Sequence, residues 1–489
     1  MTPAREARGP SFLRQARDYT AGLFLTRPLG IATAVGMRRL LDPEQMGFWS
    51  GVVRVLFDWT RITGLGVSTA ALLEIPYFRG AGDEDRAMAI RRTAFSLNAV
   101  TVTLYACAIA AAAWVLRERL GLERTATLAC AAALVVLLKY CNLYRDILRA
   151  DGKFDVLARE MVLDAVVQLA LMVLLVPRWG LLGLVAATGG AMAADLAWMS
   201  WKGGGPYCWD LRWEVLRPLV AYGAPLLLLS FLTTWLRSVD RIMVTGMIGQ
   251  EAMGHYSVGL LAYGLLYDLA NSVGIVLLTR LLEGWGRDRD LVRLRAGAMK
   301  PLCLLSLALP VLFGFGALLS PRAVAILMPE YVEGVGAARI LLAAACFSAV
   351  HVPSRHVIST LRHQVRAAPL VAVTIGLSVL LNWVLLRAGW GIAGAAIAAL
   401  AAYGLGALAH LLYALRITGG MREAPVLLGW SLLPLAYAAA GVWAAERLWP
   451  GDAWAPLAVR TAAFLAWSAP LLWAANRLYP LRRLVSRER

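Results

Sequence analysis

Long apolar stretches recur along the whole chain, and they restrict it to folds that a membrane can hold. Examples are Val162–Pro177, Leu302–Leu319 and Val371–Leu386. Each is long enough, together with its flanks, to cross a hydrocarbon core of about 30 Å as an α-helix. Because lipid offers no partner to unpaired backbone groups, we expect helices throughout the membrane. The sequence lacks the short alternating segments that a transmembrane β-barrel needs.

The composition is typical of a membrane protein. Of the 489 residues, 60% are hydrophobic and only 16% are charged, and the mean hydropathy is +0.63. A soluble globular domain carries roughly 25% charged residues. In a soluble chain the net charge of +17 would suggest nucleic acid as a partner. Here the positive-inside rule accounts for that charge better, so we expect contact with membrane lipid and no nucleic acid.

The apolar pattern predicts an all-α fold with about 14 transmembrane helices. Basic residues concentrate in every second loop, which the positive-inside rule places in the cytoplasm together with both termini. The expected location is a bacterial inner (plasma) membrane, crossed many times. The predicted helices cover residues 18–39, 45–73, 90–115, 125–148, 156–176, 180–200, 215–247, 251–282, 294–319, 332–360, 366–387, 391–415, 425–446 and 457–479.

An internal repeat relates the two halves of the chain. The segment Leu41–Ser50 resembles Ile248–Ser257, and Trp179–Gly183 resembles Trp390–Gly394. The two offsets are about 207 and 211 residues by subtraction. Six predicted helices separate the copies, so both halves have the same orientation in the membrane. Parallel repeats of this kind are related by an axis along the membrane normal and handle substrate at their interface.

The sequence offers no machinery for bond chemistry. It contains no Walker-type GxxxxGK[ST] run, no HExxH pair and no Gly-x-Ser-x-Gly elbow. Its six cysteines lack CxxC spacing, so we expect no metal site. The N-terminal segment has no short apolar region followed by a cleavage site, so we expect no signal peptide. Catalytic residues and cofactors are likewise not expected.

Several segments resemble the motifs of a known superfamily. They are Arg39–Ser50, Gly64–Ala70, Arg79–Glu84, Asp240–Met243 and Gln250–Ser257. On these segments, the helix number and the repeat, the chain resembles the multidrug/oligosaccharidyl-lipid/polysaccharide exporter superfamily, and specifically its polysaccharide-transporter branch of O-antigen-type flippases. The resemblance covers essentially the whole chain. Its motifs specify the superfamily well and the cargo poorly.

The resemblance implies two parallel six-helix lobes in a V shape, which alternate access to a central cavity, plus two C-terminal helices. In this chain it assigns an N-lobe to residues 1–200, a cytoplasmic linker to 201–213, a C-lobe to 214–416, and two helices with a basic tail to 417–489. The usual cargo of the branch is an undecaprenyl-diphosphate-linked oligosaccharide, moved from the cytoplasmic to the periplasmic leaflet. The expected protein is a monomer that works beside a polysaccharide polymerase or other assembly proteins.

Arginines inside the predicted spans are the candidate substrate-binding residues. An ionisable group at bilayer depth costs a few kcal/mol, so it needs a partner or a wet cavity. The planar guanidinium donates paired hydrogen bonds to phosphate oxygens and stays charged, which suits a diphosphate. The alternative is that these side chains are structural ion-pair locks or reach to the membrane interface. The candidates are Arg27, Arg54, Arg61, Arg237 and Arg241.

Acidic residues inside the spans are the candidates for ion coupling or charge balance. In the second predicted helix, Arg54, Asp58 and Arg61 fall at i, i+4 and i+7 and so share one face. H⁺ or Na⁺ on a buried carboxyl would distinguish the inward from the outward state, as a transport cycle requires. A hydrogen bond to a neighbouring helix is the alternative. The candidates are Asp58, Asp164, Asp195, Asp240 and Asp268.

A third group, His351, Arg355 and His356, surrounds Pro353 in the tenth predicted helix. Histidine titrates near neutral pH, but the ligand spacing of a metal site is missing here. We therefore interpret this group as structural or as a gate.

Four functions suit such a chain. A flippase for lipid-linked oligosaccharide needs a cavity rich in Arg, and a lipid II flippase shares that chemistry with a different sugar. An ion-coupled exporter of amphipathic cations expects acids to dominate, whereas Arg outnumbers Asp in the first helices of each half. A multi-spanning envelope glycosyltransferase or acyltransferase usually carries a large outside loop, and the predicted outside loops are short. The sequence therefore favours the oligosaccharide flippase.

Overall fold

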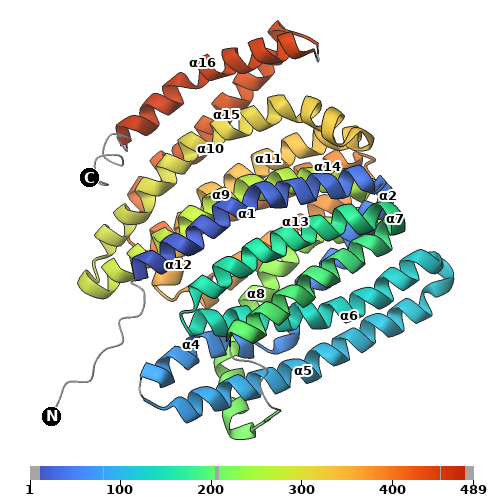
Figure 1. The fold of residues 1–489 in the computed structure, drawn as a ribbon. Coiled ribbons are helices and arrows are strands. Elements are labelled where there is room, and N and C mark those ends of the chain that lie inside the picture. The colour runs from blue at the N-terminus through green and yellow to red at the C-terminus, as the bar shows by residue number, and fades with distance from the viewer. Residues whose placement is uncertain (1–11, 81, 204–208, 452, 479–489) are drawn as a thin grey trace. The chain divides into compact units, whose positions relative to one another are not determined.

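The computed structural model describes residues 12–80, 82–203, 209–451 and 453–478. All regular secondary structure in these ranges is helical, which confirms the all-α prediction (Figure 1). Contacts divide the chain into two compact units. The first takes its residues from Met1–Asp42 and Val52–Thr234, and the second from Pro43–Gly51 and Trp235–Arg489. Residues 204–208 of the predicted linker and both basic ends of the chain lie outside the described ranges.

The first unit is a bundle of long helices around α7 (Phe154–Gly203). The backbone of α7 turns at Gly180, where φ is 52° and ψ is −127°, and its two arms then run side by side. Across this turn, Gln168 Nε2 donates a hydrogen bond to Thr188 Oγ1 at 3.3 Å. The predicted helices 156–176 and 180–200 are these two arms. The other helices of the unit are α1 (Phe12–Leu40), α3 (Arg54–Trp59), α4 (Val67–Gly80), α5 (Glu84–Val115), α6 (Arg117–Ala150) and the first part of α8 (Trp213–Met247).

The prediction of one continuous helix over residues 45–73 is wrong. Leu65 and Gly66 have positive φ values of 49° and 77°, a conformation that a right-handed helix cannot include. Arg54 and Asp58 therefore share a short helix, whereas Arg61 lies beyond its end. The segment consists of α2 (Pro43–Phe48), a π-helical turn (Trp49–Val53), α3, a 3-10 turn (Ile62–Gly64) and α4.

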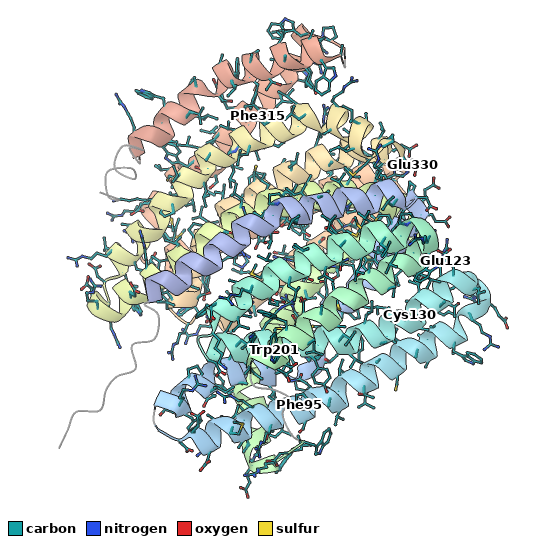
Figure 2. The ribbon with its side chains drawn as sticks, in the orientation of Figure 1. Phe95, Glu123, Cys130, Trp201, Phe315 and Glu330 are labelled. Carbon is teal, nitrogen blue, oxygen red and sulfur yellow. The ribbon has the colours of Figure 1, made fainter. Side chains whose placement is uncertain are left out.

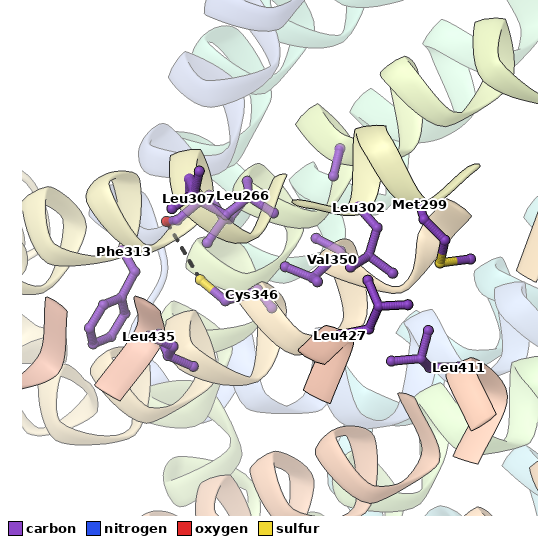
Figure 3. Packing of buried hydrophobic residues seen from close by; sticks show 14 of the residues in the cluster. Leu266, Met299, Leu302, Leu307, Phe313, Cys346, Val350, Leu411, Leu427 and Leu435 are labelled. Atoms are coloured by element: carbon purple, nitrogen blue, oxygen red, sulfur yellow. Dashed lines mark hydrogen bonds between the residues drawn. The ribbon is translucent and has the colours of Figure 1, made fainter. Parts of the chain in front are cut away.

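The second unit has its largest apolar core where α10 (Leu291–Leu327) packs against its neighbours. Figure 3 shows the side chains of Leu302, Val350 and Leu427 lying close together in this core, and all three are buried. The thiol of Cys346 donates a weak hydrogen bond to the carbonyl oxygen of Leu309 at 3.6 Å. The other helices of the unit are α2, the end of α8, α9 (Gln250–Asp288), α11 (Val335–Val350), α12 (Val352–Thr360), α13 (Gln364–Arg387), α14 (Gly391–Ile417), α15 (Ala424–Leu448) and α16 (Trp454–Leu478).

The outer surface of these helices is apolar. Large side chains such as Trp114, Val373 and Leu433 are 67%, 70% and 69% exposed. Acidic side chains such as Glu123 and Glu330 lie near helix ends (Figure 2). In the part of the chain that the structure describes, nine helical stretches are long and apolar enough to cross a membrane. Exposed apolar side chains are favourable where the surrounding solvent is hydrocarbon, as in a multi-pass membrane protein.

The two copies of the repeat touch each other within the second unit. A Cβ on Gly47 would lie 1.7 Å from the carbonyl oxygen of Gln250, and a Cβ on Gly254 would lie 1.8 Å from that of Pro43. Pro43 and Gln250 are 207 residues apart by subtraction, as are Gly47 and Gly254. Each copy therefore uses the same glycine to approach the same backbone position of the other. A helix crossing this close requires glycine at both places.

Candidate functional site

A polar cavity of about 400 Å³ lies within the first unit, where α6 passes the broken segment after α3. We call it the basic cavity. Asp146 is the acidic residue of its wall, and the polar groups of Thr60, Ser68 and Asn142 also line it. The basic residues of the wall are Arg61, Lys139, Arg145 and Arg149.

The helix break after α3 accommodates the side chain of Lys139. Its ammonium Nζ donates a hydrogen bond to the carbonyl oxygen of Thr60 at 3.2 Å. Gly64 makes room for that ammonium, because a Cβ there would lie 2.6 Å from Nζ. Lys139 is only 4% exposed. The break thus supplies both an acceptor and the space for a buried cation.

The basic cavity keeps a positive charge. Arg149 donates a hydrogen bond to Asp146 at 3.2 Å. Asp146 acts on Arg61 and Lys139 electrostatically at longer range. Neither of these two cations forms an ion pair with an acidic side chain of the described ranges. Since one carboxylate faces several cations, the cavity favours an anion.

A second cavity, of about 470 Å³, lies between α1, α6 and the first arm of α7. We call it the acidic cavity. Glu160 and Asp164 line it from α7, and Thr26 and Thr33 line it from α1. Arg145 and Arg149 line both cavities.

Arg145 holds two carboxylates of α7. Its Nε and Nη2 donate hydrogen bonds to Glu160 Oε1 at 2.8 Å and 2.5 Å, and Nη2 also reaches Asp195 Oδ2 at 3.2 Å. The side chains of Glu160 and Asp195 are each 1% exposed. The other oxygen of Asp195, Oδ1, has no hydrogen-bond partner in the described part of the chain. One guanidinium therefore serves two buried carboxylates.

The remaining candidates of the first unit do not join these cavities, except for Asp164. Arg54 lies 3.8 Å from Asp58 at i, i+4, with side-chain exposures of 58% and 32%. This geometry matches the ion-pair alternative considered for the two residues. Arg27 is half-buried in α1, directly before Pro28.

In the second unit, Arg237 lies against an aromatic ring. Its guanidinium lies 5.1 Å from the ring centroid of Tyr267. Arg355 donates a hydrogen bond to the hydroxyl of the same Tyr267 at 2.8 Å. Tyr263 stacks on Tyr267 with the ring centroids 5.7 Å apart. His351, from the group around Pro353, is 1% exposed, and neither ring nitrogen has a hydrogen-bond partner in the described ranges.

Asp240 is a buried carboxylate with a tyrosine partner. It is 2% exposed, and Tyr256 donates its hydroxyl to Oδ2 at 2.9 Å. The backbone N–H of Arg241 donates to Oδ1 at 2.9 Å. Asp268 is exposed on α9. Among the described residues, no group of three or more His, Cys, Asp or Glu side chains is placed to hold a metal ion.

Sequence reasoning missed Lys139 and Glu160. It treated Arg145 as part of the cytoplasmic charge and as the counterpart of the His351 group in the other half. A signal for them was present. Lys139 lies in the middle of the predicted span 125–148, and a charge there calls for the same explanation as the buried acids. Glu160 lies one helical turn before Asp164, so both face the same side of α7.

A comparison with protein families identifies the family of the chain. The model of the family described as "Polysaccharide biosynthesis protein" matches residues 13–281, more than half of the chain. The chain belongs to the polysaccharide biosynthesis protein family. None of the curated proteins matches it.

Solved structures extend this result. A structure of the lipid II flippase MurJ in an inward closed conformation covers 94% of this chain and 98% of its own, with a TM-score of 0.72 and 12% identity. An inward-facing multidrug resistance MATE transporter of the MOP superfamily covers 81% and 96%, with a TM-score of 0.67 and 13% identity. A MOP superfamily transporter from Pyrococcus furiosus covers 84% and 96%, with a TM-score of 0.60 and 14% identity.

The predicted resemblance is thereby confirmed. This member of the polysaccharide biosynthesis family is a multi-pass membrane protein with the fold of MOP-superfamily transporters. At these identities the likeness establishes the fold.

Proposed function

We propose that this chain is a flippase that moves an undecaprenyl-diphosphate-linked oligosaccharide, a polysaccharide precursor, across the bacterial inner membrane. The observation that carries the proposal is the basic cavity, in which Arg61 and Lys139 lack acidic partners among the described residues. The diphosphate is the anionic group of such a substrate. Charge-assisted hydrogen bonds from Arg and Lys are the strongest that side chains offer to phosphate. Membership of the family supports a polysaccharide pathway.

The size of the basic cavity limits what it holds. A volume of about 400 Å³ is at the small end of ligand pockets, which run from about 300 to 1,000 Å³. It suits the phosphate groups and not the whole molecule. In this proposal the sugars and the prenyl chain lie outside it, with the prenyl chain in the lipid.

The transport cycle in this proposal is alternating access by two lobes, residues 1–200 and 214–416, joined by the linker 201–213. Residues 417–489 add the last two of about 14 spans, and both termini lie in the cytoplasm. A monomer performs the cycle and hands its product to a polymerase. Arg27, Arg54, Arg237 and Arg241 are proposed as further substrate contacts, and Asp58, Asp240 and Asp268 as charge-balancing residues.

The acidic cavity suits an ion-coupling role within the same proposal. Asp164 lines it, and the buried Asp195 shares Arg145 with Glu160. A ligand drives a conformational cycle only if it binds the two states with different affinities. H⁺ or Na⁺ bound at these carboxyls would meet that requirement.

The test is a flipping assay in proteoliposomes with a fluorescent short-chain polyprenyl-diphosphate glycan. We expect wild type to move the probe, and Arg61→Gln and Lys139→Gln each to slow it at least tenfold. Arg293→Gln is the control, because this side chain is 74% exposed and lines neither cavity. Undiminished flipping by Arg61→Gln and Lys139→Gln would overturn the proposal.

A second candidate is an exporter of amphipathic cations. The acidic cavity favours it, because Glu160 and Asp164 both line that wall. The same liposomes distinguish the two. Transport of a fluorescent amphipathic cation, with no movement of the diphosphate probe, would replace the flippase by this exporter. A lipid II flippase differs only in the glycan of the probe that is moved.

A further inference from the structure

Arg145 is shared by two sites of opposite character. It lines the basic cavity beside Lys139 and also the acidic cavity beside Asp164. In this structure its guanidinium is turned to the acids, with hydrogen bonds to Glu160 and Asp195. Because Arg145 borders both cavities, its guanidinium turns toward the cavity whose groups bind it more strongly and adds its positive charge there.

The acids around Arg145 outnumber it in charge. Two carboxyl groups with 1% exposed side chains face one guanidinium, so ionisation of both would leave one negative charge in excess. Asp195 Oδ1 is fully buried and accepts no hydrogen bond within the described ranges. A buried charge without a partner is costly, so a proton on this pair is the simplest relief.

Among the described residues, the other groups that face the pair do not neutralise it. From α6 it faces Arg145 and the thiol of Cys141, whose Sγ donates to the carbonyl oxygen of Met192 at 3.4 Å. Arg149 of α6 lines the same cavity, but its guanidinium is paired with Asp146 at 3.2 Å. From α7 the additional neighbour is Asp164, a further carboxyl group beside the pair. From α1 the side chains that line the acidic cavity are the hydroxyls of Thr26 and Thr33.

We propose that Arg145 links protonation of the Glu160–Asp195 pair to anion binding in the basic cavity. A proton on the pair removes one of the two carboxylates that hold Arg145. The guanidinium then adds its charge to those of Arg61 and Lys139, and the anion binds more tightly. By linkage the anion also strengthens proton binding, because it draws Arg145 away from the acids. Anion binding therefore takes up a proton from solvent. The inference rests on the proposed anion site.

The experiment is titration calorimetry of the purified full chain with inorganic pyrophosphate and with farnesyl diphosphate. Each titration is run at several pH values, in two buffers of different ionisation enthalpy, which gives the number of protons exchanged on binding. The probes ionise themselves, so the decisive quantity is the difference between wild type and Asp195→Asn. For wild type we expect proton uptake beyond that of the probe, and affinity that rises on the order of tenfold as pH falls.

Asp195→Asn keeps the shape of the side chain and removes its charge. We expect it to bind as tightly at high pH as wild type does at low pH, and to lose the extra proton uptake. Glu160→Gln tests the same pair if Asp195→Asn does not fold. The control is Glu446→Gln, which removes the carboxylate of a more exposed ion pair with Arg339 (2.6 Å) in the second unit. We expect it to behave as wild type.

The outcomes separate this inference from the proposed function. If wild type binds neither probe at any pH, both fall. If wild type binds but takes up no proton beyond the probe, the anion site stands and the link through Arg145 is overturned. The link is also overturned if Asp195→Asn and Glu160→Gln retain the pH dependence of wild type.

Discussion

At the scale of single residues, Lys139 is a buried cation that has no acidic partner among the residues that the structure describes. Lys139 has one observed hydrogen bond, to the carbonyl of Thr60. Such an ammonium reduces stability unless something else binds it, because its hydration is lost on burial. A residue that costs stability at one place is expected to contribute to binding there.

Lys139→Met separates these two roles. We expect the affinity for a diphosphate probe to fall about 10- to 100-fold, since one charge-assisted hydrogen bond contributes about 1.5–3 kcal/mol. Thermal unfolding in detergent should show no loss of stability, because an apolar side chain replaces an unpaired buried charge. Calorimetric binding and unfolding scans check the two parts. A variant that unfolds earlier and binds normally would identify Lys139 as a structural residue.

Tyr256 offers a second test at this scale. Tyr256→Phe leaves Asp240 Oδ2 without its donor at 2.9 Å in a buried place. We expect a loss of about 1–3 kcal/mol in the free energy of unfolding. The control is Tyr437→Phe, which removes an exposed hydrogen bond of 2.9 Å to the carbonyl of Trp467 and should cost about 1 kcal/mol or less. Equal losses in the two variants would contradict the assignment of Asp240 as a buried carboxylate that depends on this donor.

At the scale of elements, the break after α3 decides where the basic cavity forms. It brings the Thr60 carbonyl to Lys139 and directs Arg61 to the cavity wall. Gly66 is also pressed against another helix, since a Cβ there would lie 2.3 Å from the carbonyl oxygen of Gly223 in α8. The break is thus fixed by backbone conformation and by a close contact together.

Gly66→Ala should therefore reduce the stability of the protein by more than the positive φ at this position explains. A left-handed conformation costs an alanine about 1–2 kcal/mol. Gly152→Ala is the matched control, because Gly152 has φ 69° and open space around its Cα. We expect Gly66→Ala to lower the unfolding temperature more than Gly152→Ala and also to weaken anion binding. Similar shifts in both variants would mean that the contact with Gly223 is not needed.

The elements also show what the sequence can and cannot predict. Long apolar stretches were sufficient to predict an all-helical multi-pass membrane protein, because hydrophobic length indicates a span. Nine helical stretches of the described ranges are long and apolar enough for this. The break within 45–73 was not predicted, since Leu65 is apolar and the two glycines around it are common in membrane helices. Arg61 was predicted for a cation-lined cavity, and the structure puts it on the wall of one. Arg237 was predicted from the same signal, but its aromatic partner Tyr267 comes from another helix and is invisible to local pattern.

At the scale of the whole molecule, the order of segments along the chain does not match their division between the two units. The residues of Pro43–Gly51 belong to the second unit, although the chain before and after them belongs to the first. The segment packs against α9 through Gly47 and Gly254. This segment ties the first half of the sequence to the second, and the first part of α8 makes a further tie in the opposite direction, since its residues belong to the first unit.

A split chain tests this tie. We expect fragments 1–203 and 209–489, produced together, to copurify, because residues 43–51 complete the second unit from the first fragment. Gly47→Leu should lower copurification, since even a Cβ there would overlap the Gln250 carbonyl, whereas the contact of Gly66 with Gly223 between the fragments remains. Gly30→Leu is the control, with nothing within 4 Å of its Cβ position. Copurification of the Gly47→Leu fragment at the level of the control would show that other contacts are sufficient.

The reciprocal approach of Gly47 and Gly254 gives the chain an internal two-fold relation. A contact in which each copy of a repeat offers the same residue to the same site on the other has the form of a symmetric dimer interface. The two copies therefore meet as two identical subunits would, although a single chain supplies both.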